Sequence, residues 1–326
     1  MLKPSPIWPR EVILEVTNFC NLRCRFCHIH GEGVRRRRLR GYMAEEIWRR
    51  VLSELSGWNS SRITLSLYGA GEPLLHPGFR EILKAATSIP HLDVGFMTNA
   101  MLLTEDWARF LVRLPLSWLV FSVDGVRPET NDTFRRGARL EVIERNIERL
   151  LDYRERSGAG LPRVSFNMVL YPGVEEEEVR EYVRRWGPYA ETIMISRFRP
   201  VPSKRLLSPE ERDSVKPHPC PLPFRQMVIS WDGKVGLCCE DVFMDVLLGE
   251  VTKDSLLEIF NSRRYRRIRR IHERLEFEKI PLCRDCDVWA AEEVLREETL
   301  CIGGLNFRVF HRPSGRLFVR NAHPTP

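Results

Sequence analysis

The chain has 326 residues, 43% of them apolar and 29% charged, and a formal net charge of +7, a composition typical of a soluble globular protein. No run of about eighteen apolar residues is present and the first residues lack the apolar core of a signal peptide, so neither a membrane-spanning helix nor export is expected. With nine cysteines, metal ligation in the cytoplasm is then favoured over disulfides. No aromatic stacking platform supports nucleic-acid binding.

The first predicted strand, Glu11–Thr17, leads directly into a loop that holds Cys20, Cys24 and Cys27. This spacing places three thiolates on one short loop. A [4Fe–4S] cubane has four irons, so three thiolates leave one iron open to an exogenous ligand, whereas ordinary electron-transfer clusters have four cysteines. A zinc-binding loop is the alternative, because closely spaced thiolates also bind zinc.

The cysteine loop, with the aromatic Phe26 just before its last cysteine, resembles the signature of the radical S-adenosylmethionine (SAM) enzymes. The resemblance implies that SAM chelates the open iron through its amino and carboxylate groups. It also implies that the reduced cluster cleaves SAM to methionine and a 5′-deoxyadenosyl radical. A low-potential donor such as ferredoxin or flavodoxin is the electron source that the resemblance implies.

Four consecutive arginines, residues 35–38, follow the cysteine loop. Clustered positive charge can attract an acidic substrate or partner. A solvated loop is the interpretation that we favour, because most charged runs are of that kind.

Apolar runs rich in β-branched residues alternate with amphipathic segments through the first two thirds of the chain. The predicted strands are Glu11–Thr17, Arg62–Tyr68, Leu92–Met97, Trp118–Val123, Arg163–Leu170 and Thr192–Phe198. The predicted helices are Ala44–Gly57, Gly78–Ser88, Glu105–Leu114, Leu140–Arg156 and Glu175–Trp186. Such β/α repeats predict parallel strands with helical crossovers, and they are fewer than the eight of a closed barrel. We therefore predict an α/β fold with an open, partial (β/α)6 TIM-like barrel, the arrangement that the resemblance also implies.

A loop of small residues, Gly69, Ala70 and Gly71, follows the second predicted strand and precedes Glu72 and Pro73. The absence of bulky side chains lets the polar head of a ligand approach the backbone. The loop resembles the Gly-Gly-Glu-Pro motif that binds the SAM amino group in this family, with Ala70 in place of the second glycine. An isolated Gly-x-Gly turn is more often only a tight loop, so this interpretation depends on the cysteine loop.

Polar residues also end the next strands, where α/β folds place their ligands. Asn99 ends the third, Ser122 and Asp124 end the fourth, and Asn167 lies in the fifth. The resemblance implies that Ser122 and Asn99 contact the SAM ribose, and that Arg135 contacts the SAM carboxylate. Each of these residues can equally be a cap or turn residue.

A proline-rich, charged segment at residues 199–215 predicts a linker between a barrel domain, residues 1–200, and a second domain, residues 201–326. The turn Asp232-Gly233 predicts a hairpin in the second domain. Helices are expected at Ser255–Asn261 and Tyr265–Leu275. A last hairpin of unknown role is expected from Phe307–Phe310 and Leu317–Arg320.

Four cysteines of the second domain form two pairs: Cys220 with Cys238, and Cys283 with Cys286. Four thiolates can close a structural zinc site or a fully ligated cubane. The pattern resembles the SPASM/Twitch auxiliary-cluster domain, which implies an auxiliary [4Fe–4S] cluster. Glu292 stands where the longer SPASM form has a further cysteine, so one auxiliary cluster is expected.

Two cysteines are left over by these assignments. Cys239 adjoins a proposed ligand and can substitute for it, although a buried structural thiol is the favoured interpretation. Cys301 is expected to be a packing residue.

A fully ligated cluster beside a radical generator suits a two-electron oxidation, and the spacing resembles the Twitch aminocyclitol dehydrogenases, which oxidise a carbinol. We therefore predict a radical SAM oxidoreductase acting on a small molecule. Modification of a peptide side chain, as in the SPASM maturases, is the alternative enzymatic function. A zinc or electron-carrier protein is the non-enzymatic alternative, and no residue stands out as a catalytic base.

Overall fold

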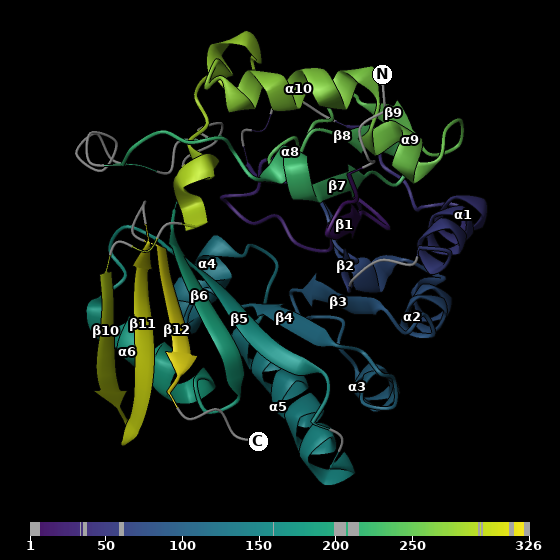
Figure 1. The fold of residues 1–326 in the computed structure, drawn as a ribbon. Coiled ribbons are helices and arrows are strands. Elements are labelled where there is room, and N and C mark those ends of the chain that lie inside the picture. The colour runs from purple at the N-terminus through teal and green to yellow at the C-terminus, as the bar shows by residue number, and fades with distance from the viewer. Residues whose placement is uncertain are drawn as a thin grey trace. The chain divides into compact units, whose positions relative to one another are not determined.

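A computed structural model describes residues 7–32, 34, 38–58, 62–158, 160–198, 207, 215–292, 294, 296–312 and 316–322 (Figure 1). The chain divides into two compact units. The first unit contains residues 1–20, 36–95 and 216–290, and the second contains residues 21–35, 96–215 and 291–326. The predicted domain boundary after residue 200, and most of the predicted linker, lie outside the described residues.

The first unit is built on parallel strands. β1 (Glu11–Leu14) pairs with β2 (Ile63–Ser66) on one side and with β7 (Gln226–Ile229) on the other. β2 pairs in turn with the first residues of β3 (Leu92–Thr98). β8 (Lys234–Gly236) and β9 (Gly249–Glu250) continue this series antiparallel. The predicted hairpin around Asp232-Gly233 is therefore confirmed as β7–β8, and it joins the barrel strands through β1.

The helices of the first unit bury one apolar face each. α1 (Glu45–Ser56) begins with an acidic first turn, which favours a helix N-terminus, and it buries Trp48 and Leu52. α9 (Leu256–Phe260) begins with a capping box formed by Ser255 and Glu258. The other helical elements are η1 (Pro73–Leu75), α2 (Phe79–Thr87), α8 (Leu222–Arg225), α10 (Arg263–Glu273), η2 (Phe277–Lys279) and η3 (Val288–Glu292).

The second unit contains three parallel strands, β4 (Trp118–Ser122), β5 (Arg163–Leu170) and β6 (Ala190–Arg197). The predicted last hairpin is confirmed as β11 (Leu305–Arg312) and β12 (Arg316–Asn321). β12 pairs antiparallel with β6, so this hairpin extends the barrel strands. An additional strand that we did not predict, β10 (Arg296–Ile302), pairs with β11.

The crossovers of the second unit are the helices α3 (Glu105–Leu111), α5 (Leu140–Ser157) and α6 (Glu176–Trp186). α4 (Pro128–Phe134) was not predicted, because its short polar sequence has no helical apolar repeat; its proline occupies the first helical turn. Phe166 of β5 stacks on Trp186 of α6 with ring centroids 4.8 Å apart, and both side chains are buried.

The α/β class and the open, partial-barrel type of sheet are confirmed by these strand pairings, in which parallel strands are joined by helical crossovers. No helix in the described part of the chain has both the length and the apolar character needed to cross a membrane.

Candidate functional site

In the first unit, the small-residue loop after β2 packs against the side chain of Glu15, which follows β1. A β-carbon on Gly69 would lie 2.5 Å from Cγ of Glu15, so only glycine fits without a shift. The backbone N–H of Ala70 donates to Oε2 of Glu15 at 2.9 Å. The Glu15 carboxylate therefore fixes the position of this loop.

The second half of the loop contacts the segment that leads to Cys20. A β-carbon on Gly71 would lie 2.5 Å from the carbonyl oxygens of both Thr17 and Phe19. The N–H of Glu72 donates to the Phe19 carbonyl oxygen at 2.8 Å. Within this unit the predicted SAM-binding loop and the beginning of the cysteine loop are thus held together by backbone contacts.

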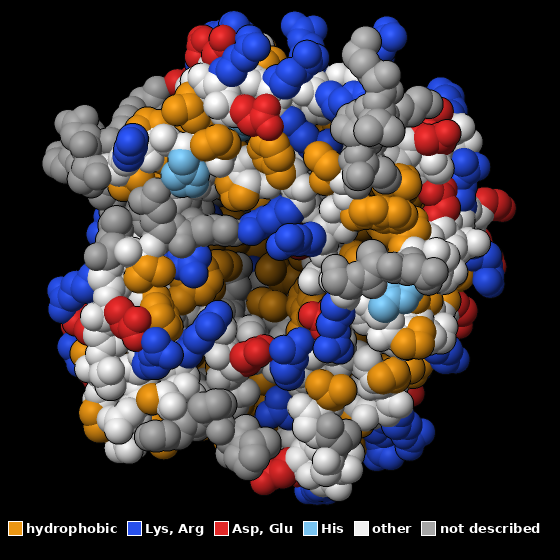
Figure 2. Space-filling view, in the orientation of Figure 1, with side chains coloured by type: hydrophobic (Ala, Val, Ile, Leu, Met, Phe, Trp, Pro, Cys, Tyr) orange, Lys and Arg blue, Asp and Glu red, His pale blue; other side chains and the backbone are white. Residues whose placement is uncertain are grey.

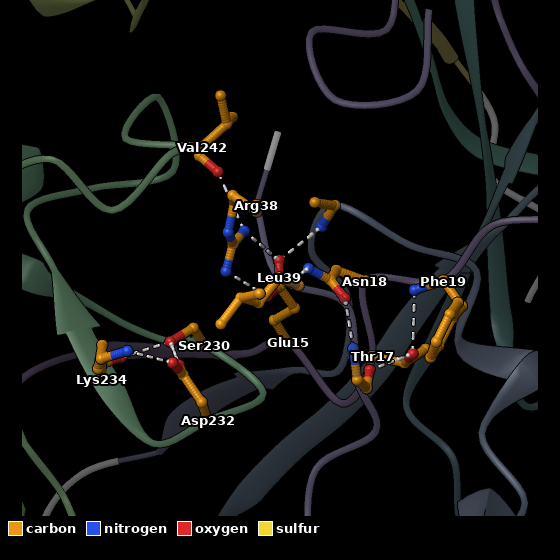
Figure 3. A network of polar contacts seen from close by, with 12 residues as sticks. Glu15, Thr17, Asn18, Phe19, Arg38, Leu39, Ser230, Asp232, Lys234 and Val242 are labelled. Atoms are coloured by element: carbon orange, nitrogen blue, oxygen red, sulfur yellow. Dashed lines mark hydrogen bonds and ion pairs between the residues drawn. The ribbon is translucent and has the colours of Figure 1, made fainter. Parts of the chain in front are cut away.

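A buried ion pair links this loop region to the segment after the hairpin β7–β8 (Figure 3). Nη2 of Arg38 lies 2.8 Å from Oε1 of Glu15, and Nη1 donates to the Val242 carbonyl oxygen at 3.0 Å. The two side chains are only 10% and 4% exposed, respectively. For Arg38 the expectation of a solvated loop is therefore wrong, and residues 35–37 lie outside the described residues.

We did not identify Glu15 from the sequence. Its only signal is an acidic residue in the apolar run Val12–Val16, which indicates a charge that folding must compensate. The partner that compensates it is Arg38, 23 residues further along the chain.

In the second unit, the loop around Cys24 and Cys27 is tied to the end of α4. The N–H of Arg25 donates to the Phe134 carbonyl oxygen at 2.9 Å, and the N–H of Cys27 donates to the Cys24 carbonyl oxygen at 3.0 Å. Burial raises the pKa of the Cys24 thiol to about 11, an effect that the positive charge of Arg135 opposes. Iron would shift this balance, because a coordinated thiol is deprotonated outright.

Polar atoms without a partner are buried near the carboxyl ends of β4 and β5. Arg135 and Asp124 form an ion pair with Nη2 and Oδ1 2.8 Å apart, and their side chains are 6% and 0% exposed. Nε of Arg135, Oδ2 of Asp124, Oδ1 of Asn167 and Oη of Tyr171 have no hydrogen-bond partner among the residues that the structure describes. Since buried polar atoms are normally paired, these atoms fit a polar ligand such as SAM or a substrate.

Three other residues that we predict to contact SAM are Asn99, Ser122 and Glu72. Asn99 donates through Nδ2 to Oδ1 of Asn21 at 2.9 Å and accepts through Oδ1 from the N–H of Met101 at 3.0 Å. Ser122 is the last residue of β4 and is 8% exposed. The Glu72 carboxylate accepts from the N–H of Leu74 at 3.2 Å. Contact of these residues with SAM stays a prediction.

The four cysteines assigned to the auxiliary site all line one cavity in the first unit, together with apolar residues that include Leu222, Phe277 and Trp289. These cysteines are Cys220, Cys238, Cys283 and Cys286. Burial raises the pKa of Cys286 to about 12 and that of Cys238 well above its ordinary value. The described residues contain no group of three or more Cys, His, Asp and Glu side chains close enough to hold a single metal ion.

The two leftover cysteines are absent from the lining of this cavity. Cys239 and Cys301 are both exposed, so the expectation that they are buried packing thiols is wrong. That expectation follows from the usual burial of cysteine, but here the side chain of Cys239 is exposed although that of Cys238 is buried.

His272 is a further residue of the auxiliary site that sequence analysis missed. It lies on the buried face of α10, lines the cysteine cavity, and places Nε2 3.6 Å from Sγ of Cys283. Burial lowers its pKa to about 4, so the imidazole is neutral at pH 7. The only sequence signal was its position four residues after the apolar Ile268, which places it on the same side of the helix.

These features define a class of protein: an α/β fold with an open set of parallel strands, a three-cysteine loop after its first strand, and a separate four-cysteine cavity. Residues 14–185 match the radical SAM superfamily, and residues 220–287 match the SPASM iron–sulfur cluster-binding domain. The chain belongs to the radical SAM superfamily. A [4Fe–4S] cluster and SAM are therefore its cofactors, and the SPASM domain adds auxiliary iron–sulfur binding.

Curated relatives differ in what they act on. The chain is 24% identical, over 86% of its length and 87% of the relative, to the tungsten-containing aldehyde ferredoxin oxidoreductase cofactor-modifying protein of Pyrococcus furiosus. It is 26% identical to the GTP 3′,8-cyclase of Clostridium botulinum, over 60% of its own length and 58% of the cyclase.

Solved structures share the fold at low sequence identity. BtrN in complex with AdoMet and 2-DOIA has a TM-score of 0.58 and 17% identity, with 87% of this chain and 94% of BtrN covered. Streptococcus suis SuiB bound to its precursor peptide SuiA has a TM-score of 0.63 and 14% identity, with 80% of this chain and 67% of SuiB covered.

Proposed function

We propose that this protein is a radical SAM oxidoreductase that removes two electrons from an organic substrate, with an auxiliary [4Fe–4S] cluster as the acceptor of one of them. The observation that carries the proposal is the cavity lined by four cysteines, of which Cys220, Cys238 and Cys283 are buried and Cys286 is half-buried. Four protein thiolates suit a fully ligated cluster, which accepts electrons without binding substrate. When bound, the cofactors supply a 5′-deoxyadenosyl radical and a one-electron acceptor.

The substrate step balances for a carbinol carbon. Its C–H bond breaks and the hydrogen atom forms 5′-deoxyadenosine; the hydroxyl proton then leaves, the second bond of the carbonyl forms, and one electron passes to the auxiliary cluster. The protein contributes positioning and exclusion of water. A small-molecule carbinol is the substrate class that we propose, and a peptide side chain is the alternative.

The chain's own residues have defined roles in this proposal. Cys20, Cys24 and Cys27 hold the SAM-binding cluster, and the loop from Gly69 to Glu72 binds the SAM amino group. Ser122 and Asn99 contact the ribose, and Arg135 contacts the carboxylate. Support comes from the unpartnered Nε of buried Arg135 and from the close approach of backbone at Gly69 and Gly71.

A cytoplasmic location and a ferredoxin or flavodoxin as the low-potential donor belong to the same proposal. The nine cysteines are all free of disulfides, as a reducing compartment favours.

Deuterated candidate substrates test the first half of the reaction. We expect transfer of deuterium from the oxidised carbon into 5′-deoxyadenosine, for a carbinol and not for a peptide. Label transfer from a peptide side chain instead would replace the small-molecule proposal by the maturase alternative. An anaerobic, reduced sample that leaves SAM intact with every substrate would exclude both.

The electron-acceptor role is tested by Cys283→Ala with Cys286→Ala. This double variant should still form 5′-deoxyadenosine but should not release oxidised product. Cys239→Ala with Cys301→Ala is the matched control, because it also removes two thiols but leaves the cavity intact, and it should turn over normally. Unimpaired product formation by the first variant refutes the role of the auxiliary cluster.

A further inference from the structure

One side of α10 carries a stripe of exposed arginines, which we call the arginine stripe. Its members are Arg263, Arg266, Arg267 and Arg270 of α10, and Arg274, which directly follows the helix as its C-cap. Residues three and four apart lie on the same side of a helix, so these five guanidinium groups are neighbours. Lys and Arg side chains gather along the edge of Figure 2 at which Figure 1 draws α10.

The arginines of the first turns of α10 are unfavourable for the helix that carries them. Like charges four residues apart destabilise a helix, and Arg263 with Arg267, and Arg266 with Arg270, are such pairs. The first turn of α10 also has no acidic residue, although acidic residues are favoured there by the helix dipole. Folding of α10 therefore gives no reason for the arginines at its beginning, whereas the helix dipole favours Arg270 in its last turn.

Several arginines on other helices are paired with acids. Arg49, Arg109 and Arg180 each form an ion pair with the glutamate one turn before them. None of the arginines of the stripe forms an ion pair with a carboxylate anywhere in the described residues. Glu273 is the one exposed acidic residue of α10, so the stripe keeps an excess of positive charge, which attracts an anionic partner.

The opposite side of the same helix reaches the auxiliary site. Tyr265 and His272 are buried there, and His272 contacts Sγ of Cys283 at 3.6 Å. A single helix, about 10 Å across with its side chains, thus lies between the arginine stripe and a cysteine of the auxiliary site.

We propose that the arginine stripe is the docking surface for an acidic one-electron carrier protein that exchanges electrons with the auxiliary cluster across α10. This inference rests on the proposed function, in which that cluster gains one electron in each turnover. On exchange the cluster is oxidised by one electron and the carrier is reduced by one, and no bond or proton changes. The redox site behind the stripe favours such a carrier over a nucleic acid, and the stripe offers no exposed aromatic residue on which bases could stack.

The test uses the holoprotein and an acidic flavodoxin as the probe. The variant carries Arg263→Gln, Arg266→Gln, Arg267→Gln and Arg270→Gln. The control carries Arg145→Gln, Arg156→Gln, Arg180→Gln and Arg184→Gln, which removes the same charge from exposed positions on α5 and α6. Flavodoxin affinity is measured by titration calorimetry over a range of salt concentrations, and electron exchange with the chemically reduced auxiliary cluster is measured by stopped flow.

We expect the wild type to bind flavodoxin more weakly as salt rises, because screening weakens such contacts. The α10 variant should lose about tenfold or more in affinity and exchange rate, and the control less than about twofold. A small uncharged oxidant should reoxidise all three proteins at one rate, which shows that the cluster is intact.

The proposal is overturned by a wild type without salt-dependent affinity for flavodoxin, or by an α10 variant that binds flavodoxin as the control does. Single-stranded RNA that binds the stripe when flavodoxin does not would also overturn it. Failure of the proposed function can be told apart from failure of the docking proposal. Oxidation of substrate without reduction of the auxiliary cluster would refute the proposed function, whereas the flavodoxin affinities would still show whether the arginine stripe binds the carrier.

Discussion

Arg38→Met leaves the Glu15 carboxylate without its counter-charge at a position where that side chain is only 4% exposed. Removal of one member of a buried ion pair costs about 3–5 kcal/mol, because the remaining charge stays desolvated. The hydrogen bond from Arg38 to the Val242 carbonyl oxygen is lost as well, at about 1 kcal/mol. We therefore expect the free energy of unfolding to fall by about 4 kcal/mol or more.

A second substitution separates charge from packing. Glu15→Gln retains a carbonyl oxygen that accepts from the N–H of Ala70, and it removes the buried negative charge. In the Arg38→Met background this change should restore about 2 kcal/mol, since no unpaired charge is then buried. In the wild-type background the same change should destabilise, because it leaves the charge of Arg38 unpaired.

The assay is urea unfolding of the anaerobic holoprotein, followed by tryptophan fluorescence. Arg49→Gln is the control, because it breaks an ion pair whose side chains are 61% and 62% exposed, and it should cost no more than about 1 kcal/mol. If Arg38→Met is no more destabilising than the control, or if the double variant is as unstable as the sum of the single ones, the ion pair does not have this role.

Three further predictions concern the cofactor sites. Alanine at Cys20, Cys24 and Cys27 should abolish SAM cleavage and lower the iron content from about eight to about four per chain; loss of all iron would contradict independent sites. Gly71→Ala places a β-carbon 2.5 Å from two carbonyl oxygens, so it should lower the free energy of unfolding by about 1–3 kcal/mol. It should also weaken SAM binding in an equilibrium titration, whereas the control Ala70→Gly should leave SAM binding unchanged. His272→Phe should lower the midpoint potential of the auxiliary cluster, because a hydrogen bond to a ligating sulfur raises that potential and the variant removes it. Redox titrations monitored by electron paramagnetic resonance measure the change. An unchanged potential would show that the 3.6 Å contact to Cys283 is not such a bond.

The sequence was sufficient to predict a feature wherever the residues that define it lie close together in the chain. Three cysteines within one loop identify the superfamily, because their spacing along the chain already determines which chemistry they can share. The parallel strands were predicted from runs such as Leu92–Met97, since a strand buried on both faces is mostly apolar, and Asp93 is the one charged residue of this run.

The sequence was insufficient where the partner is distant or the pattern is polar. The Glu15–Arg38 pair joins residues 23 positions apart, and one arginine in a basic run gives no sign that it is buried. β10 was missed because six of its seven residues are exposed or half-buried, so the strand has no continuous apolar run. α4 was missed because only Asn131 of its residues is buried.

The pairing of β7 with β1 joins the SPASM region to the strand that precedes the cysteine loop. These strands are parallel and in register from Glu11 with Gln226 to Leu14 with Ile229, so their carboxyl ends lie at the same edge of the first unit. Cys20 follows β1, and Cys238 follows the hairpin that β7 begins. Residues that follow parallel strands lie at the same edge of a sheet. This single pairing therefore helps to position both the first cysteine of the SAM site and the hairpin that precedes Cys238. A substitution that disrupts the β1–β7 pairing, such as Met227→Pro, which removes the N–H that the ladder requires, should therefore lower iron occupancy at both sites together, unlike loss of either cysteine set.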